Sequence, residues 1–375
     1  LLALTLALIM VLGVAPLNEL AGVDWTSLFA PKAEAVGKTY KVGDIVEFGS
    51  YPQSRVTDSS LVSALNKASK KWVSYGYYSG DGSFGTMVQG DWMKYADFIY
   101  NGTKYRAVTF SQYRPSWTCY SSSSSNTHQC DNGYTPNNIY YFKYEPLKWR
   151  ILDSSTGLAF CESIIDSQAF SNITYYYNSY HWNDAEYTIY ENDYATSSIR
   201  AWLNDDFYNT AFSSSQKASI LTSKLDNKAY SASRSEFDSE TTYDKVFLLS
   251  WSEIQNTAYG FSSNSARQAK GTDYAKCQGL NVDSSNECSE WRLRSPGSYS
   301  YNTCYVYSDG DFDHHRAADR TDLGVRPAIK ISNLASAISE PCSNPETLLD
   351  TDGDGLPDVW EKEGLDSVSY THLRA

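Results

Sequence analysis

Apolar residues recur along this chain at a spacing typical of short strands. Residues 44–49 alternate polar and apolar positions, as a half-buried strand does, and residues 49–52 are expected to end it in a turn. Similar runs occupy residues 104–110, 147–152, 157–162, 246–249, 291–294, 303–307 and 325–331. Residues 153–157 have the composition of a hairpin turn. Strands and helices do not alternate regularly, so the pattern predicts an α+β fold with mainly antiparallel sheet and a few amphipathic helices.

The predicted helices are short, and each begins behind a residue that caps helix N-termini. Asp58 caps the first, Ser197 or Ser198 caps the second, and a third begins at residues 213–215. Their apolar faces are formed by Leu61, Leu65 and Ala68 in the first helix, and by Ile199, Trp202, Leu203 and Phe207 in the second. Residues 250–253 have the form of a capping box, which predicts a further helix.

The two ends of the chain are not expected to belong to the folded domain. Residues 1–12 are an apolar run too short to span a bilayer, and residues 33–35 have the small-x-small form of a cleavage site. We therefore expect residues 1–35 to be a signal peptide, truncated at its N-terminus because no Met or basic residue precedes the run. Residues 368–375 resemble the translation of a sequencing-library adaptor. We therefore expect residues 367–375 to be an artefact that is not part of the natural protein. The domain between them, residues 36–331, is expected to be secreted or held at the cell surface.

Charge and hydropathy narrow the possible partners. The net charge of -13 and the pI near 4.9 exclude an extended basic surface of the kind that nucleic acid needs. No second apolar stretch is long enough to cross a bilayer, so no membrane span is expected in the mature chain.

Seven cysteines in an exported chain are candidates for disulfides. Cys119 with Cys130, and Cys277 with Cys288, have short spacings that a disulfide can close, although spacing alone does not assign the pairs. Cys161 and Cys304 lie in apolar strand-like runs, where buried and inert thiols are common.

The sharpest chemical motif follows a predicted linker, residues 332–347. Residues 348–366 contain the D-x-D-x-D-G-x5-E pattern of calcium-binding loops. The expected ligands are Asp350, Asp352, Asp354, Leu356 through its carbonyl, Asp358 and Glu361. Oxygen ligands in this number suit Ca²⁺, the cofactor that we predict. Pro357 departs from a paired EF-hand, and the motif also resembles thrombospondin type-3-like and dockerin-like calcium repeats; the alternative is a flexible acidic linker.

Tyrosine is unusually frequent, with 31 residues, many of them among Ser, Asn and Gly as in recognition loops. If Cys304 and Val306 face the core, alternation turns Tyr305 and Tyr307 outward. The predicted ligand-binding residues are Tyr299, Tyr301, Asn302, Tyr305, Tyr307 and Asp309. The negative charge disfavours an anionic partner, which leaves a neutral glycan or a surface protein. A Tyr-rich edge strand without a ligand is the alternative.

The five histidines form no familiar catalytic or metal motif. His314 and His315 are adjacent, and neighbouring side chains of a strand point to opposite faces, so a solvated turn is expected there in preference to a metal site.

Several motifs between residues 42 and 329 resemble a family of exported bacterial domains known only as a domain of unknown function. The motifs are Val42-Gly43-Asp44-Ile45-Val46-Glu47-Phe48-Gly49-Ser50-Tyr51-Pro52-Gln53, Leu147-Lys148-Trp149-Arg150-Ile151-Leu152, Ile199-Arg200-Ala201-Trp202-Leu203-Asn204, Phe247-Leu248-Leu249-Ser250, Trp291-Arg292-Leu293-Arg294-Ser295-Pro296-Gly297 and Gly324-Val325-Arg326-Pro327-Ala328-Ile329. This resemblance covers about 290 residues and implies no function.

Residues 294–299 and 324–326 also resemble, more distantly, the formylglycine-generating-enzyme branch of the C-type-lectin-like fold. The resemblance implies a lectin-like fold for the domain. Enzymes of that branch hold copper with two close cysteines, whereas this segment offers only Cys304, so their chemistry is not expected here.

A ligand-binding module for adhesion or recognition, rather than an enzyme, is the preferred function. The alternative is the non-catalytic part of a larger secreted enzyme.

Overall fold

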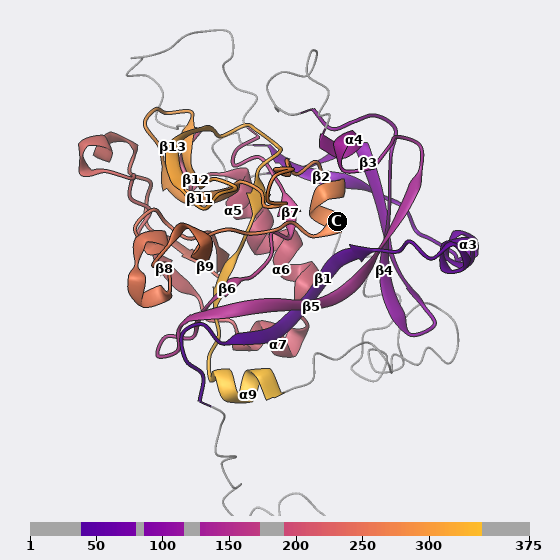
Figure 1. The fold of residues 1–375 in the computed structure, drawn as a ribbon, viewed down its shortest axis with the longest axis horizontal. Coiled ribbons are helices and arrows are strands. Elements are labelled where there is room, and N and C mark those ends of the chain that lie inside the picture. The colour runs from indigo at the N-terminus through magenta and orange to yellow at the C-terminus, as the bar shows by residue number, and fades with distance from the viewer. Residues whose placement is uncertain (1–38, 80–85, 116–127, 173–190, 340–375) are drawn as a thin grey trace, which may run out of the picture. The chain divides into compact units, whose positions relative to one another are not determined.

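Two mainly antiparallel β-sheets carry most of the fold in the computed structural model, which describes residues 39–79, 86–115, 128–172 and 191–339. The described residues from Tyr40 onward form one compact unit. Short helices lie against the sheets (Figure 1). The prediction of an α+β fold with mainly antiparallel sheet is confirmed.

In the described part of the chain, the first sheet has eight strands in the order β10-β15-β6-β5-β4-β3-β2, and β1 pairs with β5. These strands are β1 (Ile45–Arg55), β2 (Val73–Ser79), β3 (Thr86–Tyr100), β4 (Thr103–Phe110), β5 (Ile139–Asp153), β6 (Leu158–Cys161), β10 (Val246–Phe247) and β15 (Ala328–Lys330). Alternate residues of β5, Leu147, Trp149 and Ile151, are fully buried, as its apolar pattern predicts. The hairpin turn expected before β6 is confirmed, because β5 and β6 pair across it.

The second sheet, counted over the same described residues, has five strands in the order β13-β12-β11-β14-β7. They are β7 (Asp166–Ser167), β11 (Trp291–Pro296), β12 (Asn302–Val306), β13 (Phe312–Ala317) and β14 (Gly324–Val325). A separate short pair joins β8 (Ser223–Leu225) to β9 (Thr242–Asp244). In Figure 1, β11, β12 and β13 lie together at the upper left, with β8 and β9 below them.

Two strand predictions need correction. The turn expected at residues 49–52 is a bulged continuation of β1, in which Gly49 has φ 73° and Tyr51 is buried. The run 325–331 is also interrupted, because Arg326 and Pro327 separate β14 from β15. Proline cannot donate to a sheet ladder, and here the chain passes from one sheet to the other. Periodicity identified the apolar residues in both runs without showing these breaks.

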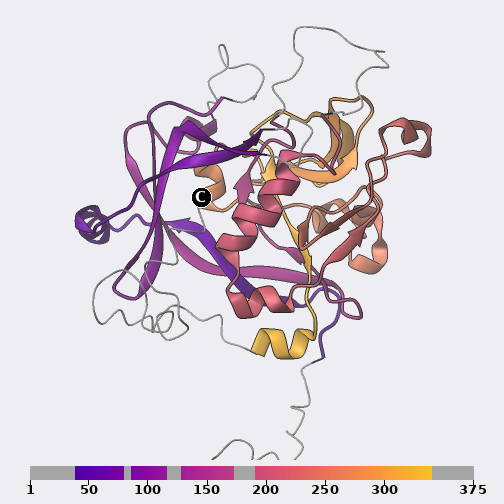
Figure 2. The same ribbon diagram turned by 180° about the vertical axis from the view of Figure 1, so that it is seen from behind.

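The expected N-terminal caps of three helices are confirmed. Asp58 accepts a hydrogen bond from Leu61 N at 2.7 Å, Ser197 accepts one from Arg200 N, and Ser213 forms a capping box with Gln216. The helices that follow are α3 (Ser59–Lys67), α5 (Ser198–Trp202) with η2 (Leu203–Phe207) and α6 (Tyr208–Ala211), and α7 (Ser214–Ser219). Figure 2 shows α5, η2 and α6 as one continuous helical segment, and this segment contacts β1, β2 and β10.

The remaining described helices are short. They are α4 (His128–Asp131), η3 (Ala232–Phe237), η4 (Glu253–Gln255), η5 (Thr257–Tyr259), η6 (Asn264–Ala266), α8 (Asp273–Cys277) and α9 (Leu334–Ser339). The capping box expected at residues 250–253 forms, since Glu253 N donates to Ser250 Oγ and Ser250 N donates to the Glu253 carboxylate. Only the single turn η4 follows it, because Asn256 leaves the helical region of backbone conformation. Helix α9 lies inside the predicted linker, with Leu334 buried, so any linker begins later than expected.

Candidate functional site

Tyr299 and Tyr301 present two parallel aromatic rings at the surface. Their ring centroids are 5.6 Å apart and their planes differ by 7°. The two residues are 36% and 41% exposed, which places them among the most exposed large hydrophobic side chains of the described residues. We call this pair the tyrosine platform.

The platform lies on the connection from β11 to β12, which is fixed on both sides. Gly297 N donates to Asn302 O at 2.8 Å, and Asn302 N donates to Tyr299 O at 2.9 Å. Asn192 holds the turn from outside, since its side chain donates to Tyr299 O and its backbone N donates to Ser300 O. The rings are therefore carried by an ordered turn while staying accessible.

Two predicted ligand-binding residues are buried, which corrects the expectation that they contact a ligand. Tyr305 is 3% exposed and Asn302 is 5% exposed. Cys304 and Val306 face the core as expected. Tyr305 does lie on the opposite face of β12, but Arg316 covers its ring at 4.4 Å and pairs with Glu290. The alternation of side chains along β12 predicted the face on which Tyr305 lies. It could not show that the ion pair of Arg316 and Glu290 covers the Tyr305 ring.

Tyr307 and Asp309 lie at the far end of β12 from the tyrosine platform. Tyr307 is partly buried and donates to Asp313 Oδ2 at 3.1 Å, whereas Asp309 is exposed and accepts from Asp311 N. Tyr307 follows Tyr301 by six positions of extended chain, or roughly 20 Å at the rise of a β-strand. The predicted site residues therefore form two separate groups with a buried strand between them.

A second aromatic group was missed from the sequence. Tyr230 and Trp251, which precede β11, lie against Phe312 and His314 of β13. Trp251 is 5.7 Å from Tyr230 and 4.8 Å from Phe312 between ring centroids, and Tyr230 stacks on His314 at 3.8 Å. All four side chains are partly exposed. His314 and His315 are thus part of strand β13, and the expected solvated turn is wrong.

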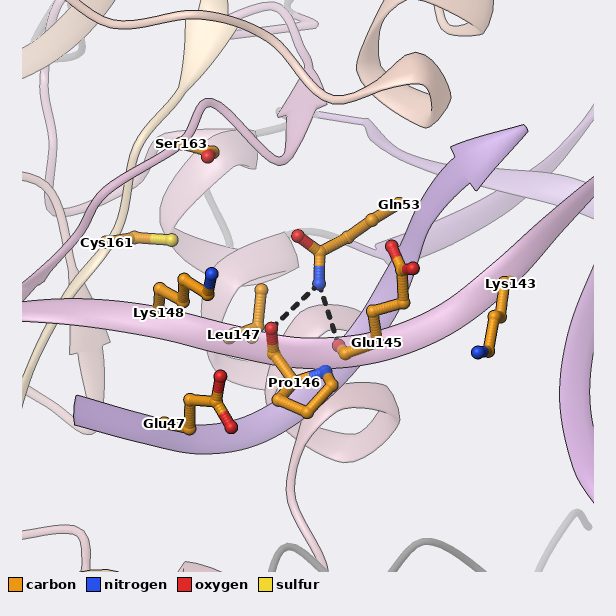
Figure 3. Close-up of a pocket in the computed structure, with 9 residues that line it drawn as sticks. All are labelled: Glu47, Gln53, Lys143, Glu145, Pro146, Leu147, Lys148, Cys161 and Ser163. Atoms are coloured by element: carbon orange, nitrogen blue, oxygen red, sulfur yellow. Dashed lines mark hydrogen bonds between the residues drawn. The ribbon is translucent and has the colours of Figure 1, made fainter. Parts of the chain in front are cut away.

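A surface pocket of about 430 Å³ lies over β1 and β5 (Figure 3). Its lining residues are Glu47, Gln53, Lys143, Glu145, Pro146, Leu147, Lys148, Cys161 and Ser163. Gln53 Nε2 donates to the carbonyls of Glu145 and Pro146, which leaves less of its side chain to bind a ligand. Burial raises the pKa of Cys161 to about 12, so its thiol stays protonated at neutral pH and is a poor nucleophile. The pocket offers charges of both signs without an activated group.

The arginines of the Trp291–Pro296 strand have structural roles. Arg292 is fully buried and donates to Gln168 O, Thr303 Oγ1 and the carbonyls of Ala317, Ala318 and Arg320. Burial lowers the pKa of Arg292 to about 9, which still leaves it charged at neutral pH. Arg294 donates to Leu248 O and pairs with Glu253. These arginines join distant segments to β11.

The cysteines follow the sequence prediction in part. Cys161 and Cys304 are buried, as expected. Cys277 and Cys288 carry free thiols, so the spacing that allows a disulfide between them does not produce one. Cys119 and the six expected calcium ligands, from Asp350 to Glu361, lie outside the described residues.

Comparison with known families gives a match to a domain of unknown function (DUF6273) over residues 165–333. The matched segment contains the tyrosine platform and the second aromatic group, but begins after the motifs at residues 42–53 and 147–152. No curated protein and no solved structure matches the chain. Among the described residues, no helix is long and apolar enough to cross a membrane.

Proposed function

We propose that the chain is a secreted or cell-surface recognition module that binds a neutral glycan on the tyrosine platform. The observation that carries the proposal is the parallel, exposed pair of rings on a fixed turn. Aromatic faces pack against the apolar faces of sugar rings, and rigid aromatic anchors commonly dominate binding energy.

Polar groups next to the platform suit the hydroxyl groups of a sugar. The Arg234 guanidinium lies 5.8 Å from the Tyr299 ring centroid, and Ser300 lies between the two tyrosines. Because Asn192 and Gly297 already fix the turn, little conformational entropy is lost when a ligand binds. A neutral ligand is favoured, since the chain's net charge of -13 repels anionic polymers.

Three further parts of the proposal rest on the sequence. The resemblance around β11 and β14 supports a C-type-lectin-like fold, and two mainly antiparallel sheets with few helices are compatible with it. The spacing of acidic residues supports a Ca²⁺ loop through Asp350, Asp352, Asp354, Leu356, Asp358 and Glu361. The apolar run at residues 1–12 supports secretion.

A glycan array with the intact chain tests the proposal, followed by the double variant Tyr299→Ala/Tyr301→Ala. Tyr243→Ala is the matched control, because Tyr243 is 62% exposed on β9, outside the platform. We expect the double variant to weaken glycan binding at least about tenfold, as the loss of a central aromatic anchor does. The control should bind as the unchanged chain does.

Equal binding by the folded double variant and by the control would show that the platform is not the site. If the array shows no glycan but the platform is needed to capture a purified surface protein, the ligand class is wrong and the location is right.

A further inference from the structure

Three consecutive residues of β13, Asp313, His314 and His315, bring their ligand atoms together. The atoms of this group all lie within 4.8 Å of one another. His315 Nδ1 lies 2.9 Å from Asp313 Oδ1, and His314 Nδ1 lies 3.2 Å from the same oxygen. Neither the glycan site nor the expected calcium loop uses these residues.

A β-bulge explains why adjacent histidines converge. In the pairing of β12 with β13, Thr303 pairs with Arg316 and Tyr305 pairs with Asp313. Cys304 therefore faces two residues, His314 and His315. A bulge of this kind breaks the alternation of the strand and redirects its side chains, and here the two ring centroids are 4.1 Å apart.

The neighbouring segment fixes the bulge in place. Ser298 N donates to His314 O at 3.0 Å, and a Cβ atom on Gly297 would lie 2.2 Å from that oxygen. Only glycine allows this close approach without a shift of the backbone.

The surrounding side chains orient the three ligands. In the tautomer protonated at Nε2, His315 donates to Ser298 Oγ at 3.1 Å and keeps the lone pair of Nδ1. Tyr307 donates to Asp313 Oδ2, and His314 N donates to Asp313 Oδ1 at 2.7 Å. A carboxylate oxygen has two lone pairs, so Oδ1 keeps one for a metal ion. The His314 ring is stacked on Tyr230, with the Trp251 ring at 84° to it. The Nδ1 atom of His314 finds no hydrogen-bond partner among the described residues.

We propose that Asp313 Oδ1, His314 Nδ1 and His315 Nδ1 bind a divalent transition-metal ion, with Zn²⁺ the ion that the ligand set fits best. Zinc binds imidazole nitrogen and carboxylate oxygen at about 2.0–2.2 Å, so tetrahedral ligands lie about 3.3 Å from one another. The separations of 2.9 and 3.2 Å are close to that value. Two nitrogen ligands disfavour Ca²⁺ and Mg²⁺, which prefer oxygen.

The fourth coordination position would face solvent, because His315 is exposed and Asp313 and His314 are only partly buried. Sites with three protein ligands and one open position admit water or an oxygen atom of a bound molecule. Such an ion would lie beside Trp251 and Phe312, and it does not depend on glycan binding at the tyrosine platform.

Calorimetric titration of the untagged full chain with Zn²⁺, in saturating Ca²⁺ to occupy the acidic loop, tests the site. We expect one Zn²⁺ per chain, and binding at least about tenfold weaker in His315→Ala and in Asp313→Asn. Asp311→Asn on the same hairpin and His128→Gln are matched controls that should bind zinc unchanged. Ser298→Ala should weaken binding without abolishing it.

A second readout guards against misfolded variants. The Co²⁺-loaded chain should show the strong visible absorption of four-coordinate cobalt, and His315→Ala should lose it while keeping the melting temperature of the unchanged chain. No zinc binding at millimolar Zn²⁺ would overturn the proposal. Equal affinity in His315→Ala, Asp313→Asn and the controls would do the same.

Discussion

The guanidinium of Arg316 lies over the ring of Tyr305, with Arg316 Cζ 4.4 Å from the ring centroid. Arg316 also pairs with Glu290, so a charged pair forms the outer cover of an aromatic residue. Tyr307 completes the cover, with its ring centroid 4.8 Å from that of Tyr305. Tyr305 is therefore expected to contribute to folding, and Tyr301 to recognition.

Tyr305→Ala should lower the free energy of unfolding by about 3–5 kcal/mol, as the loss of a large buried aromatic side chain does. Tyr301→Ala should lower it by less than about 1 kcal/mol, because that residue is 41% exposed. Urea denaturation followed by Trp fluorescence measures both values. Similar losses in the two variants would contradict this division between a buried and an accessible tyrosine.

Arg292→Met should be among the most destabilising substitutions in β11. It removes the donors that satisfy Gln168 O and three carbonyls of residues 317–320, and each unsatisfied buried group costs about 1–3 kcal/mol. A loss of at least about 3 kcal/mol is expected in urea denaturation. Arg234→Met is the matched control on a partly exposed arginine and should cost less than about 1 kcal/mol. Similar losses of unfolding free energy in Arg292→Met and Arg234→Met would show that the bonds from Arg292 to Gln168 and to residues 317–320 do not stabilise the fold.

Local patterns in the sequence predicted the elements that local physics decides. Asp58, Ser197 and Ser213 cap their helices because a side-chain oxygen accepts from a backbone N–H two or three residues ahead. The burial of Leu147, Trp149 and Ile151 likewise follows from alternation within one strand.

The candidate sites depend on contacts that no local pattern contains. Tyr305 is covered by Arg316, which the pairing of β12 with β13 brings to it. His314 and His315 converge because of a one-residue difference in that same pairing. The packing of Trp251 on Phe312 joins residues about 60 positions apart. Arg292 is a polar residue in the sequence, and its burial depends on carbonyls supplied by two other segments.

The calcium loop remains a prediction, since it lies outside the described residues. Titration of the full chain with Ca²⁺ should show one site, with modest affinity because the loop is single. Asp352→Ala and Glu361→Ala should each abolish the heat, because each removes a carboxylate ligand. Asp309→Ala is a matched control on an exposed aspartate of the folded domain. Unchanged heat in both loop variants would show that the acidic segment is not a calcium site.

Asp166 is a buried carboxyl group whose ionisation should affect stability. It is 1% exposed and accepts hydrogen bonds from Tyr51 Oη, Ser167 N and Gln168 Nε2. Burial raises its pKa to about 6, although these donors and the nearby Arg114 favour the charged form.

A raised pKa means that the folded protein holds this proton more tightly than the unfolded chain does. The stability that comes from Asp166 is therefore fully present below pH 3.8 and is lost as the pH rises to about 6. The loss should be about 3 kcal/mol, from a shift of about two pKa units at 1.36 kcal/mol each.

Asp166→Asn does not titrate, so the stability of the unchanged chain should fall by this amount relative to the variant between pH 4 and pH 7. Urea denaturation of both chains across that range measures the difference, which cancels the contributions of the other carboxyl groups. Tyr51→Phe, which removes a donor to the charged form, should move the transition to higher pH. A constant difference between the unchanged chain and Asp166→Asn would show that Asp166 ionises in the folded protein as it does in the unfolded chain.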